Sequence, residues 1–442
     1  MAATTPSSPL SRFGKLTELR QRLVFLVLAL IVFRLGSFIP IPGVNPEAMT
    51  RMIEQGGGLL NMFNMFSGGA LARFSLFALG VMPYISASIV VQMMGSVLPA
   101  WQQLKKEGQS GQRTMTKYTR WGTVGLSAFQ AFAIAMALQK EGISGGVPVV
   151  YDPGLGFIFA SVIGLTAGSM FLMWLGEQMT ERGIGNGISL IIFAGIVAGL
   201  PQALTQTFTM ASNGELTPIK VLLVVAIVAL VTAFCVFMES AQRRITVNYA
   251  RRQGGSKAYM NQSSHLPLKI NMSGVIPPIF ASTLILFPAT ASTWFSNASQ
   301  MHWLQRLTTA LSPGEPPYMI LYAAMIIIFA FFYTAIVFNS QETADNLKRS
   351  GALIPGLRPG KATADYIDAV LTRLTGAGAI YLAAVCLIPT FMQTEWHVPF
   401  YFGGTSLLIV VVVAMDFRAQ VSAHLVSHQY ESLLKKANLR RT

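Results

Sequence analysis

The sequence has few charged residues. Only 11% of its 442 residues are Asp, Glu, Lys or Arg, whereas 52% are hydrophobic and the mean hydropathy is +0.51. Soluble globular domains carry roughly 25% charged residues. So little polar surface cannot cover a chain of this length in water, and the remaining apolar surface must face lipid. The composition therefore excludes an ordinary soluble domain and indicates an integral membrane protein.

Cysteine and catalytic motifs are also scarce. The two cysteines, Cys235 and Cys386, each lie in an apolar run, which is typical of small hydrophobic residues in helix packing. Neither their number nor their spacing suggests a metal site or a disulfide framework. The sequence has no G-x-x-x-x-G-K-[ST] phosphate loop, no H-E-x-x-H, and no aspartate pair or facing Ser/His pair of an intramembrane protease. We therefore expect no cofactor and no enzyme activity.

Long stretches without charge predict membrane-spanning helices. The residues between Arg73 and Lys105, and between Lys269 and Arg306, include no Asp, Glu, Lys or Arg. A spanning helix needs about 20 apolar residues. Solid runs such as Val221–Met238 favour helices over the alternating pattern of a barrel strand. Trimming at Pro, Gly and charges predicts ten helices, at residues 23–40, 76–98, 119–138, 155–175, 187–207, 219–238, 271–291, 317–338, 374–391 and 399–417.

Basic residues set the orientation of these helices. Of the 32 Lys and Arg residues, 26 fall in the leader, the alternate loops and the tail that share one side. This positive-inside pattern predicts that both termini are cytoplasmic. The net charge of +14 is then mostly a topology signal, although the basic loops could also dock an acidic or RNA-bearing partner. Arg34 interrupts the first span, so we expect it to snorkel to the far interface or to face the bundle interior.

An internal repeat relates the second and seventh spans. Gly80–Ser88 and Gly274–Ser282 share Gly, Val, Pro, Ile, Ala and Ser in register. Each copy lies in the second span of a five-span half, and an odd number of spans inverts the second half relative to the first. The sequence therefore predicts an all-α polytopic membrane protein with two inverted five-helix halves, in which these two helices are partners.

The absence of carboxylates near the centre of any span decides between transport classes. Glu177, Glu239 and Asp416 all lie at predicted cytoplasmic ends. Secondary transporters usually carry ionisable groups at mid-membrane. The sequence therefore favours a passive conduit that a partner drives. A secondary transporter of small solutes, and an insertase or assembly scaffold without a through-pore, remain as alternatives.

The predicted organisation follows from the spans. Residues 1–22 form a cytoplasmic leader, 23–207 an N-terminal half, 208–218 an extracytoplasmic hinge loop, 219–418 a C-terminal half and 419–442 a cytoplasmic tail. The C-terminal half includes long basic loops at 240–270 and 340–373, and loops of this length are often functional. Gly56–Phe74 reads as a short, weakly amphipathic helix that cannot cross a bilayer, so it either lies on the surface or folds back into the bundle.

Five motifs, in order, resemble the SecY family of protein-export channels over nearly the whole chain. They are Phe38–Gly43, Asn64–Ala70, Gly176–Gln178 with Glu181–Gly187, Asn346–Lys348 with Gly356–Gly360, and Pro399–Ile409. The resemblance implies an hourglass channel whose waist is a ring of apolar side chains: Val81, Ile85, Ile188, Ile192, Ile279 and Ile409. Branched apolar groups can gate by dewetting and offer a passing chain no hydrogen bonds that would hold it.

The resemblance also implies moving parts. A plug at about residues 60–73 would seal the ring, through Leu60, Phe63, Asn64, Met65, Phe66, Ser67, Gly68 and Gly69. A lateral gate between the second and seventh helices would carry the polar residues Ser86, Ser88, Gln92, Ser282 and Thr283. Polar contacts within membranes are worth about 0.6–2 kcal/mol each, enough for a reversible closure.

The implied partners are SecE and SecG in the membrane, and the SecA ATPase or a translating ribosome on the cytoplasmic side, together with signal peptides and nascent chains. The residues expected to dock the motor or ribosome are Arg243, Arg244, Arg251, Arg252, Lys257 and Arg358. Gly254–Lys257 replaces basic residues that the family often has in this loop, which weakens the expected contact with RNA. The implied location is the bacterial plasma membrane.

Overall fold

The computed structural model describes residues 17–55, 64–140, 143–144, 147–214, 217–249, 263–295, 315–396 and 404–438. Within these residues, seven helices are long and apolar enough to span a membrane, and the apolar segments Met82–Val97 and Ile276–Ile285 are shorter. Helix α2 (Thr17–Gly36) occupies the first predicted span and carries Glu18, Arg20, Arg22 and Arg34. Each of the ten predicted spans therefore contains a helix.

Several helices are longer than predicted because they continue past the apolar core into polar sequence. The predicted third, fourth, fifth, ninth and tenth spans correspond to α7 (Gln109–Lys140), α8 (Leu155–Arg182), α9 (Gly187–Ser212), α15 (Lys361–Trp396) and α16 (Gly404–Asn438). The sixth and eighth are α10 (Pro218–Ser240) and α13 (Pro316–Val337). Hydropathy marks the apolar part of a helix, whereas the hydrogen-bonded helix ends at its caps.

The second and seventh helices begin later than predicted. Helix α5 (Met82–Val97) starts six residues after the expected position, and α11 (Ile276–Phe295) starts five residues after it. Gly80 and Gly274 precede them with φ angles of 57° and 63°, a left-handed conformation that favours glycine and cannot continue a helix. Proline is the second residue of each helix, at Pro83 and Pro277, where it suits a first helical turn. The repeated motif is thus a helix-start motif.

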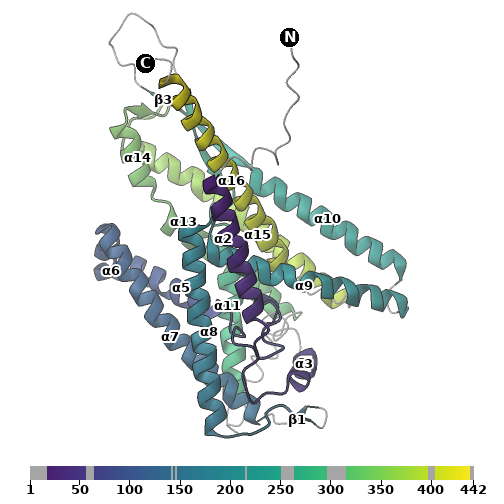
Figure 1. Cartoon of the computed structure of the whole chain (residues 1–442). Helices are drawn as coiled ribbons and strands as arrows, with labels where there is room; N and C mark the ends of the chain where they lie inside the picture. The colour runs from purple at the N-terminus through teal and green to yellow at the C-terminus, as the bar shows by residue number, and fades with distance from the viewer. Residues whose placement is uncertain are drawn as a thin grey trace, which may run out of the picture. The chain divides into compact units, whose positions relative to one another are not determined.

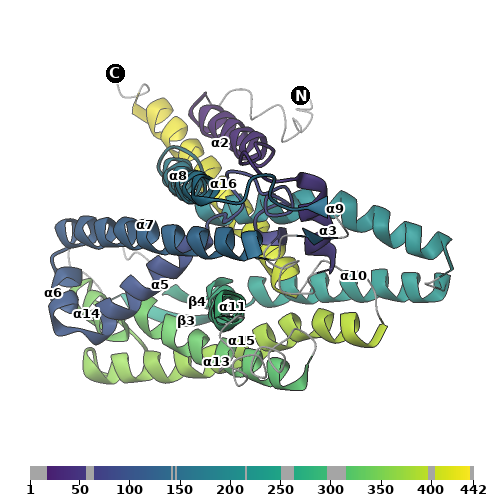
Figure 2. The same cartoon turned by 90° about the horizontal axis from the view of Figure 1, so that it is seen from below.

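The chain divides into two compact units. One comprises Met1–Thr205, Thr293–Ser299 and Val413–Thr442, and the other comprises Gln206–Ser292 and Gln300–Val412. In the first unit α7 packs along α8 and α5, and α2 packs on α8 (Figure 1). The short helix α6 (Pro99–Lys106) turns back between α5 and α7 (Figure 2).

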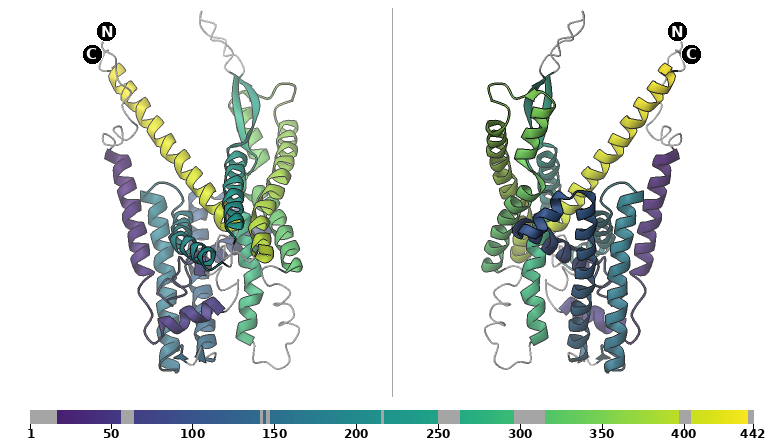
Figure 3. Two further views of the ribbon diagram at one scale, coloured as in Figure 1. Left: turned by 90° about the vertical axis from the view of Figure 1, so that its right-hand side faces the viewer. Right: turned by 90° about the vertical axis from the view of Figure 1, so that its left-hand side faces the viewer.

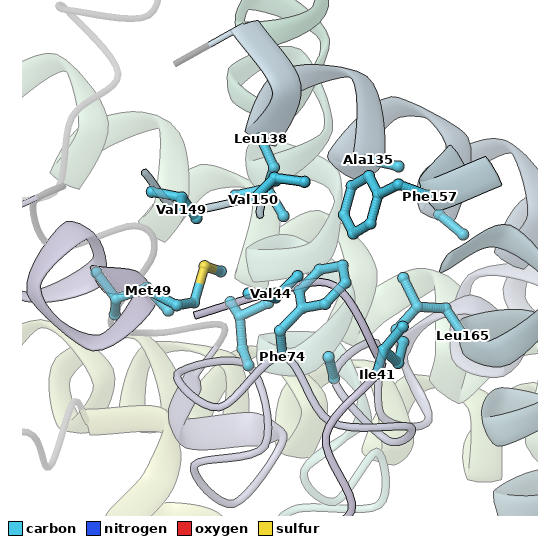
Figure 4. Packing of buried hydrophobic residues seen from close by; sticks show 14 of the residues in the cluster. Ile41, Val44, Met49, Phe74, Ala135, Leu138, Val149, Val150, Phe157 and Leu165 are labelled. Atoms are coloured by element: carbon cyan, nitrogen blue, oxygen red, sulfur yellow. The ribbon is translucent and has the colours of Figure 1, made fainter. Parts of the chain in front are cut away.

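The core of the first unit lies where its loops meet the ends of α7 and α8. Phe74 and Phe157 face each other with ring centroids 6.3 Å apart, and Met49 of α3 (Pro46–Gln55) lies close to Val149 in the same cluster (Figure 4). Backbone bridges from Pro40 to Ser75 and from Val44 to Val150 hold the three connecting segments together, beside the small hairpin of β1 (Ile143–Ser144) and β2 (Val147–Pro148).

The second unit contains a three-stranded sheet that the all-α prediction missed. β3 (Gln242–Tyr249) continues from α10 and pairs antiparallel with both β4 (Ser263–Lys269) and β5 (Ala352–Leu353) (Figure 3). Ile245 and Val247 of β3 pack with Leu268, Ile367 and Leu371 in one buried cluster. α14 (Ser340–Arg349) and α15 pack together beneath this sheet. The predicted 6/7 and 8/9 loops are therefore built, in part, as one folded platform.

Candidate functional site

The ring residues of α5 are placed by the helix-start motif. Val81 is the N-cap of α5, and its carbonyl accepts the backbone N–H of Ile85 at 3.0 Å, so the two side chains lie one turn apart. Both are buried. The same relation holds in the second unit, where the carbonyl of Val275 accepts the N–H of Ile279 at 3.4 Å.

The ring residues of α9, Ile188 and Ile192, follow a turn that explains the glycines of the third motif. Asn186 caps the helix by accepting the N–H of Ile188 at 3.1 Å, and Gly185 has a φ of 94°. A Cβ on Gly187 would lie 2.1 Å from the carbonyl oxygen of Gly176, so only glycine fits the tight passage from α8 to α9. Ile192 is buried. Ile188 is half-buried and packs on Gly176 of α8.

The remaining ring residues belong to the second unit. Ile279 on α11 and Ile409 on α16 are both buried, and Ile409 lies in the first turns of α16 near the close contact of Gly404 with Cys386 on α15. The ring thus draws on both compact units, and its closure around a pore stays a prediction.

The predicted gate residues divide in the same way. On α5, Gln92 donates from its side-chain amide to Ser88 at 3.1 Å, and Ser86, Ser88 and Gln92 are all half-buried. On α11, Ser282 and Thr283 both donate to the carbonyl of Ile279, at 2.9 and 2.7 Å. These hydroxyls can exchange such local bonds for bonds to a partner helix, and the gate itself remains a prediction.

The plug prediction falls partly outside the described residues, which omit Leu60 and Phe63. From Asn64 onwards the segment folds on itself. The side chain of Asn64 accepts the N–H of Ala72 at 2.9 Å, its carbonyl accepts the N–H of Gly69 at 2.8 Å, and Ser67 accepts the N–H of Leu71 at 3.2 Å. Phe66, Ser67, Ala70 and Leu71 are buried. Of the two sequence-based alternatives, the structure shows the folded-back one.

Arg34 also takes the inward of its two predicted positions. Its guanidinium is half-buried and donates to the carbonyl of Gly68 at 2.8 Å, which joins α2 to the folded-back segment.

Candidate docking residues from two loops lie on and beside the sheet of the second unit. Arg243 and Arg244 are exposed on β3. Arg358 is exposed in the turn after β5, between Gly356 and Gly360 at φ angles of 83° and 113°. Its neighbour Leu357 packs against the cluster that contains Ile245, so the turn is anchored to the sheet. Arg251, Arg252 and Lys257 lie outside the described residues.

Comparison with known proteins decides the family. The SecY family model matches residues 75–418. The protein translocase subunit SecY of Escherichia coli strain K12 is 58% identical over 429 residues, which cover 97% of this chain and 96% of that protein. The chain belongs to the SecY family. The SecY translocase subunit of Vibrio cholerae is 59% identical over 429 residues, which cover 96% of each chain.

Solved structures show the same fold at low sequence identity. One described as a protein conducting channel has a TM-score of 0.69 at 16% identity and covers 96% of this chain and 98% of that one. Canine Sec61 in a ribosome-channel complex has a TM-score of 0.66, also at 16% identity, with 96% and 98% covered. The prediction of a helical polytopic membrane protein with the SecY channel fold is therefore confirmed. As a SecY family member the chain is a protein-conducting channel subunit of the Sec translocon, not an enzyme.

Sequence reasoning missed two buried features of this SecY-family chain. The first is Val275, which the repeat pairs with Val81 and which is also buried. The second is the contact of Asn271 with Glu239, a residue that is only 8% exposed although its sequence position suggested a helix end in the cytoplasm. The repeat contained the signal for the first. The second had no sequence signal, because the two residues lie 32 positions apart.

Proposed function

We propose that the chain conducts unfolded, signal-bearing polypeptides across the bacterial plasma membrane and releases apolar segments sideways into lipid, with both termini in the cytoplasm. The observation that carries this proposal is the repeated helix start. Two buried pairs, Val81 with Ile85 and Val275 with Ile279, stand at equivalent places on the second and seventh helices. Such pairs supply branched apolar side chains to a constriction, and the two equivalent helices can form the two sides of a lateral gate.

The driving force comes from a partner that docks on the basic platform. Arg243 and Arg244 are exposed on β3, and Arg358 is exposed in a turn that is anchored to the same sheet. Guanidinium groups bind carboxylates and phosphates in a two-point geometry, so both the SecA ATPase and a ribosome fit this surface. SecE and SecG complete the membrane complex. Two structural neighbours, canine Sec61 and yeast Ssh1, are described as bound to ribosomes, which supports a ribosomal partner.

A reconstitution experiment tests the proposal. Proteoliposomes with this chain, SecE and SecG receive SecA, ATP and a signal-bearing precursor, and protected precursor is measured after protease treatment. We expect protection that depends on ATP and on the signal. Absence of protection with partners that are active beside the E. coli relative would overturn the proposal. Ion-coupled uptake of small solutes by the same vesicles would favour the transporter alternative instead.

A further inference from the structure

The segment Asn64–Phe77 is held at two places of different strength. At its end, Ser75 pairs with Pro40 through the backbone, and the ring of Phe77 stacks between Phe33 and Phe171 with centroids 6.2 and 5.8 Å apart. A Cβ on Gly168 of α8 would lie 1.9 Å from the carbonyl oxygen of Leu76. Such interlocked packing cannot separate without opening the core of the unit.

The other attachment, around Gly68, includes one charged hydrogen bond and one contact between two glycine backbones. Arg34 donates to the carbonyl of Gly68, and the backbone of Gly68 also rests on Gly195 of α9. A Cβ built on Gly195 would meet the oxygen of Phe66 at 3.2 Å and the nitrogen of Gly68 at 3.3 Å. Both are tighter than ordinary Cβ contacts, so an alanine at position 195 would push the backbone of Phe66 and Gly68 away by a few tenths of an ångström.

Two positively charged side chains lie close together at this seat and repel each other. The guanidinium groups of Arg34 and Arg73 lie 4.8 and 4.1 Å from the centre of the same ring, that of Phe38. Neither forms an ion pair within the described part of the chain, and Nη1 of Arg73 is buried without a hydrogen-bond partner. Two cations on one ring attract the ring but repel each other. The hydrogen bond from Arg34 to Gly68 therefore acts against a built-in repulsion.

We infer that Arg34 and Gly195 form the releasable seat of the plug: Arg34 latches the carbonyl of Gly68, Gly195 receives its backbone, and Phe74–Phe77 stay fixed as the pivot when the segment leaves. This inference rests on the proposed plug role of the segment. Gly69 has a φ of 82° and no atom within 4 Å of its Cβ position, so the chain has room to bend there. Release of the segment then breaks the hydrogen bond of Arg34 and the contact with Gly195, together with the buried contacts of Phe66 and Leu71 and the hydrogen bond from Thr50 to the carbonyl of Ala72.

The test uses the complete channel complex in planar bilayers without precursor, and records resting ion conductance. Arg34→Met removes the donor but keeps an unbranched chain. Gly195→Ala adds a methyl group that presses against the backbone of Phe66 and Gly68. We expect both variants to raise the open fraction about tenfold or more, because hydrogen bonds to charged groups and buried carbonyls left unpaired are worth at least that factor. Arg34→Lys, which keeps one donor, restores much of the closure.

Matched controls separate a seat from a general loss of packing. Gly199→Ala lies one turn further along α9, where a Cβ meets no atom within 4 Å. Arg51→Met removes an exposed arginine of α3. Both controls keep the parent conductance. Hydrogen–deuterium exchange of residues 64–73 gives a second measurement that needs no pore, and it rises in Arg34→Met and Gly195→Ala while exchange at 74–77 stays slow.

The outcomes distinguish this inference from the proposed function. If the parent translocates precursor but neither Arg34→Met nor Gly195→Ala changes conductance or exchange, the seat is wrong and the channel stands. If Gly199→Ala leaks as much as Gly195→Ala, the effect belongs to α9 as a whole and the seat is again wrong. If the parent itself translocates nothing, the proposed function fails first, and exchange alone then decides whether Arg34 holds the segment.

Discussion

The side-chain amide of Asn271 donates to the buried carboxylate of Glu239 at 2.5 Å, and so ties the end of α10 to the start of α11. The same side chain accepts the hydroxyl of Ser273 at 3.0 Å and the N–H of Gly274 at 3.1 Å. One residue thus satisfies a buried carboxylate and shapes the left-handed turn from which the seventh helix departs. Buried polar groups of this kind are costly when a partner is removed.

Asn271→Ala is therefore expected to destabilise the protein. It leaves Glu239 without this partner and releases the turn at Gly274, which we expect to lower the free energy of unfolding by about 2–4 kcal/mol. Thermal unfolding of the complex in detergent measures it. Ser240→Ala removes an exposed hydroxyl bonded only within its own helix, to Val236, and serves as the control. Equal midpoints for the two variants would contradict the account.

The ion pair of Arg120 with Glu177 is expected to contribute little. Its two bonds, at 3.3 and 2.6 Å, join α7 to α8, but the arginine side chain is 53% exposed. Water and salt screen such a pair, so a double-mutant cycle with Arg120→Gln and Glu177→Gln should give a coupling below about 1 kcal/mol. A coupling above about 2 kcal/mol that persists in high salt would show that the pair is structural.

The membrane helices could be predicted from the sequence, whereas the sheet of the second unit could not. Charge-free runs predicted ten spans, each of which contains a helix, and seven of the described helices are long and apolar enough to cross a membrane, because lipid constrains every residue of a spanning helix. The sheet of the second unit escaped prediction although Ile245 and Val247 alternate with exposed Thr246 and Asn248. That period-2 pattern is only a few residues long, and the charged setting of the loop masked it. Its partner strand β5 is more than 80 residues away in sequence, beyond the reach of any local pattern.

Arg358 is expected to act in docking and not in folding. Its guanidinium is exposed, while its backbone carbonyl accepts the hydroxyl of Thr363 at 2.9 Å, a contact that substitution of the side chain leaves in place. We expect Arg358→Ala to slow SecA-driven translocation by roughly tenfold or more, with an unchanged unfolding midpoint, because a docking arginine at an interface centre is worth at least that factor. Arg349→Ala removes an equally exposed arginine from α14 and is the control. Equal rates for both variants would remove Arg358 from the docking surface.

The gate prediction is tested by a reversible crosslink. Cysteines at Ser88 and Ser282 are introduced after Cys235 and Cys386, both free and buried, have been replaced by alanine. A disulfide needs Cα atoms within about 7 Å, so its formation on oxidation reports directly that the second and seventh helices meet. We expect the crosslink to stop translocation and reduction to restore it. Full translocation by the crosslinked channel would show that lateral opening between these helices is unnecessary.

The positions of candidate residues in the fold could be predicted where the sequence contained repetition or a motif, and could not where a contact was long-range. Val81, Ile85 and Ile279 could be placed because two copies of one helix start fix their positions. The seat of Gly68 on Gly195 could not, because a close approach of two glycine backbones leaves no pattern of side chains to recognise. Arg34 was recognised as anomalous in an apolar helix, yet only the fold shows which carbonyl it binds.

The most direct test of the central claim asks what lies beside a polypeptide halted in transit. A photo-reactive amino acid replaces Ile192 or Ile279 in the ring, or Leu222, whose side chain on α10 is 74% exposed and serves as the lipid-facing control. A precursor with a folded C-terminal domain is then driven into the channel by SecA and stops part-way. Adducts to the precursor from both ring positions and none from Leu222 are the predicted result. Adducts from Leu222 with none from either ring position would contradict the pore described here.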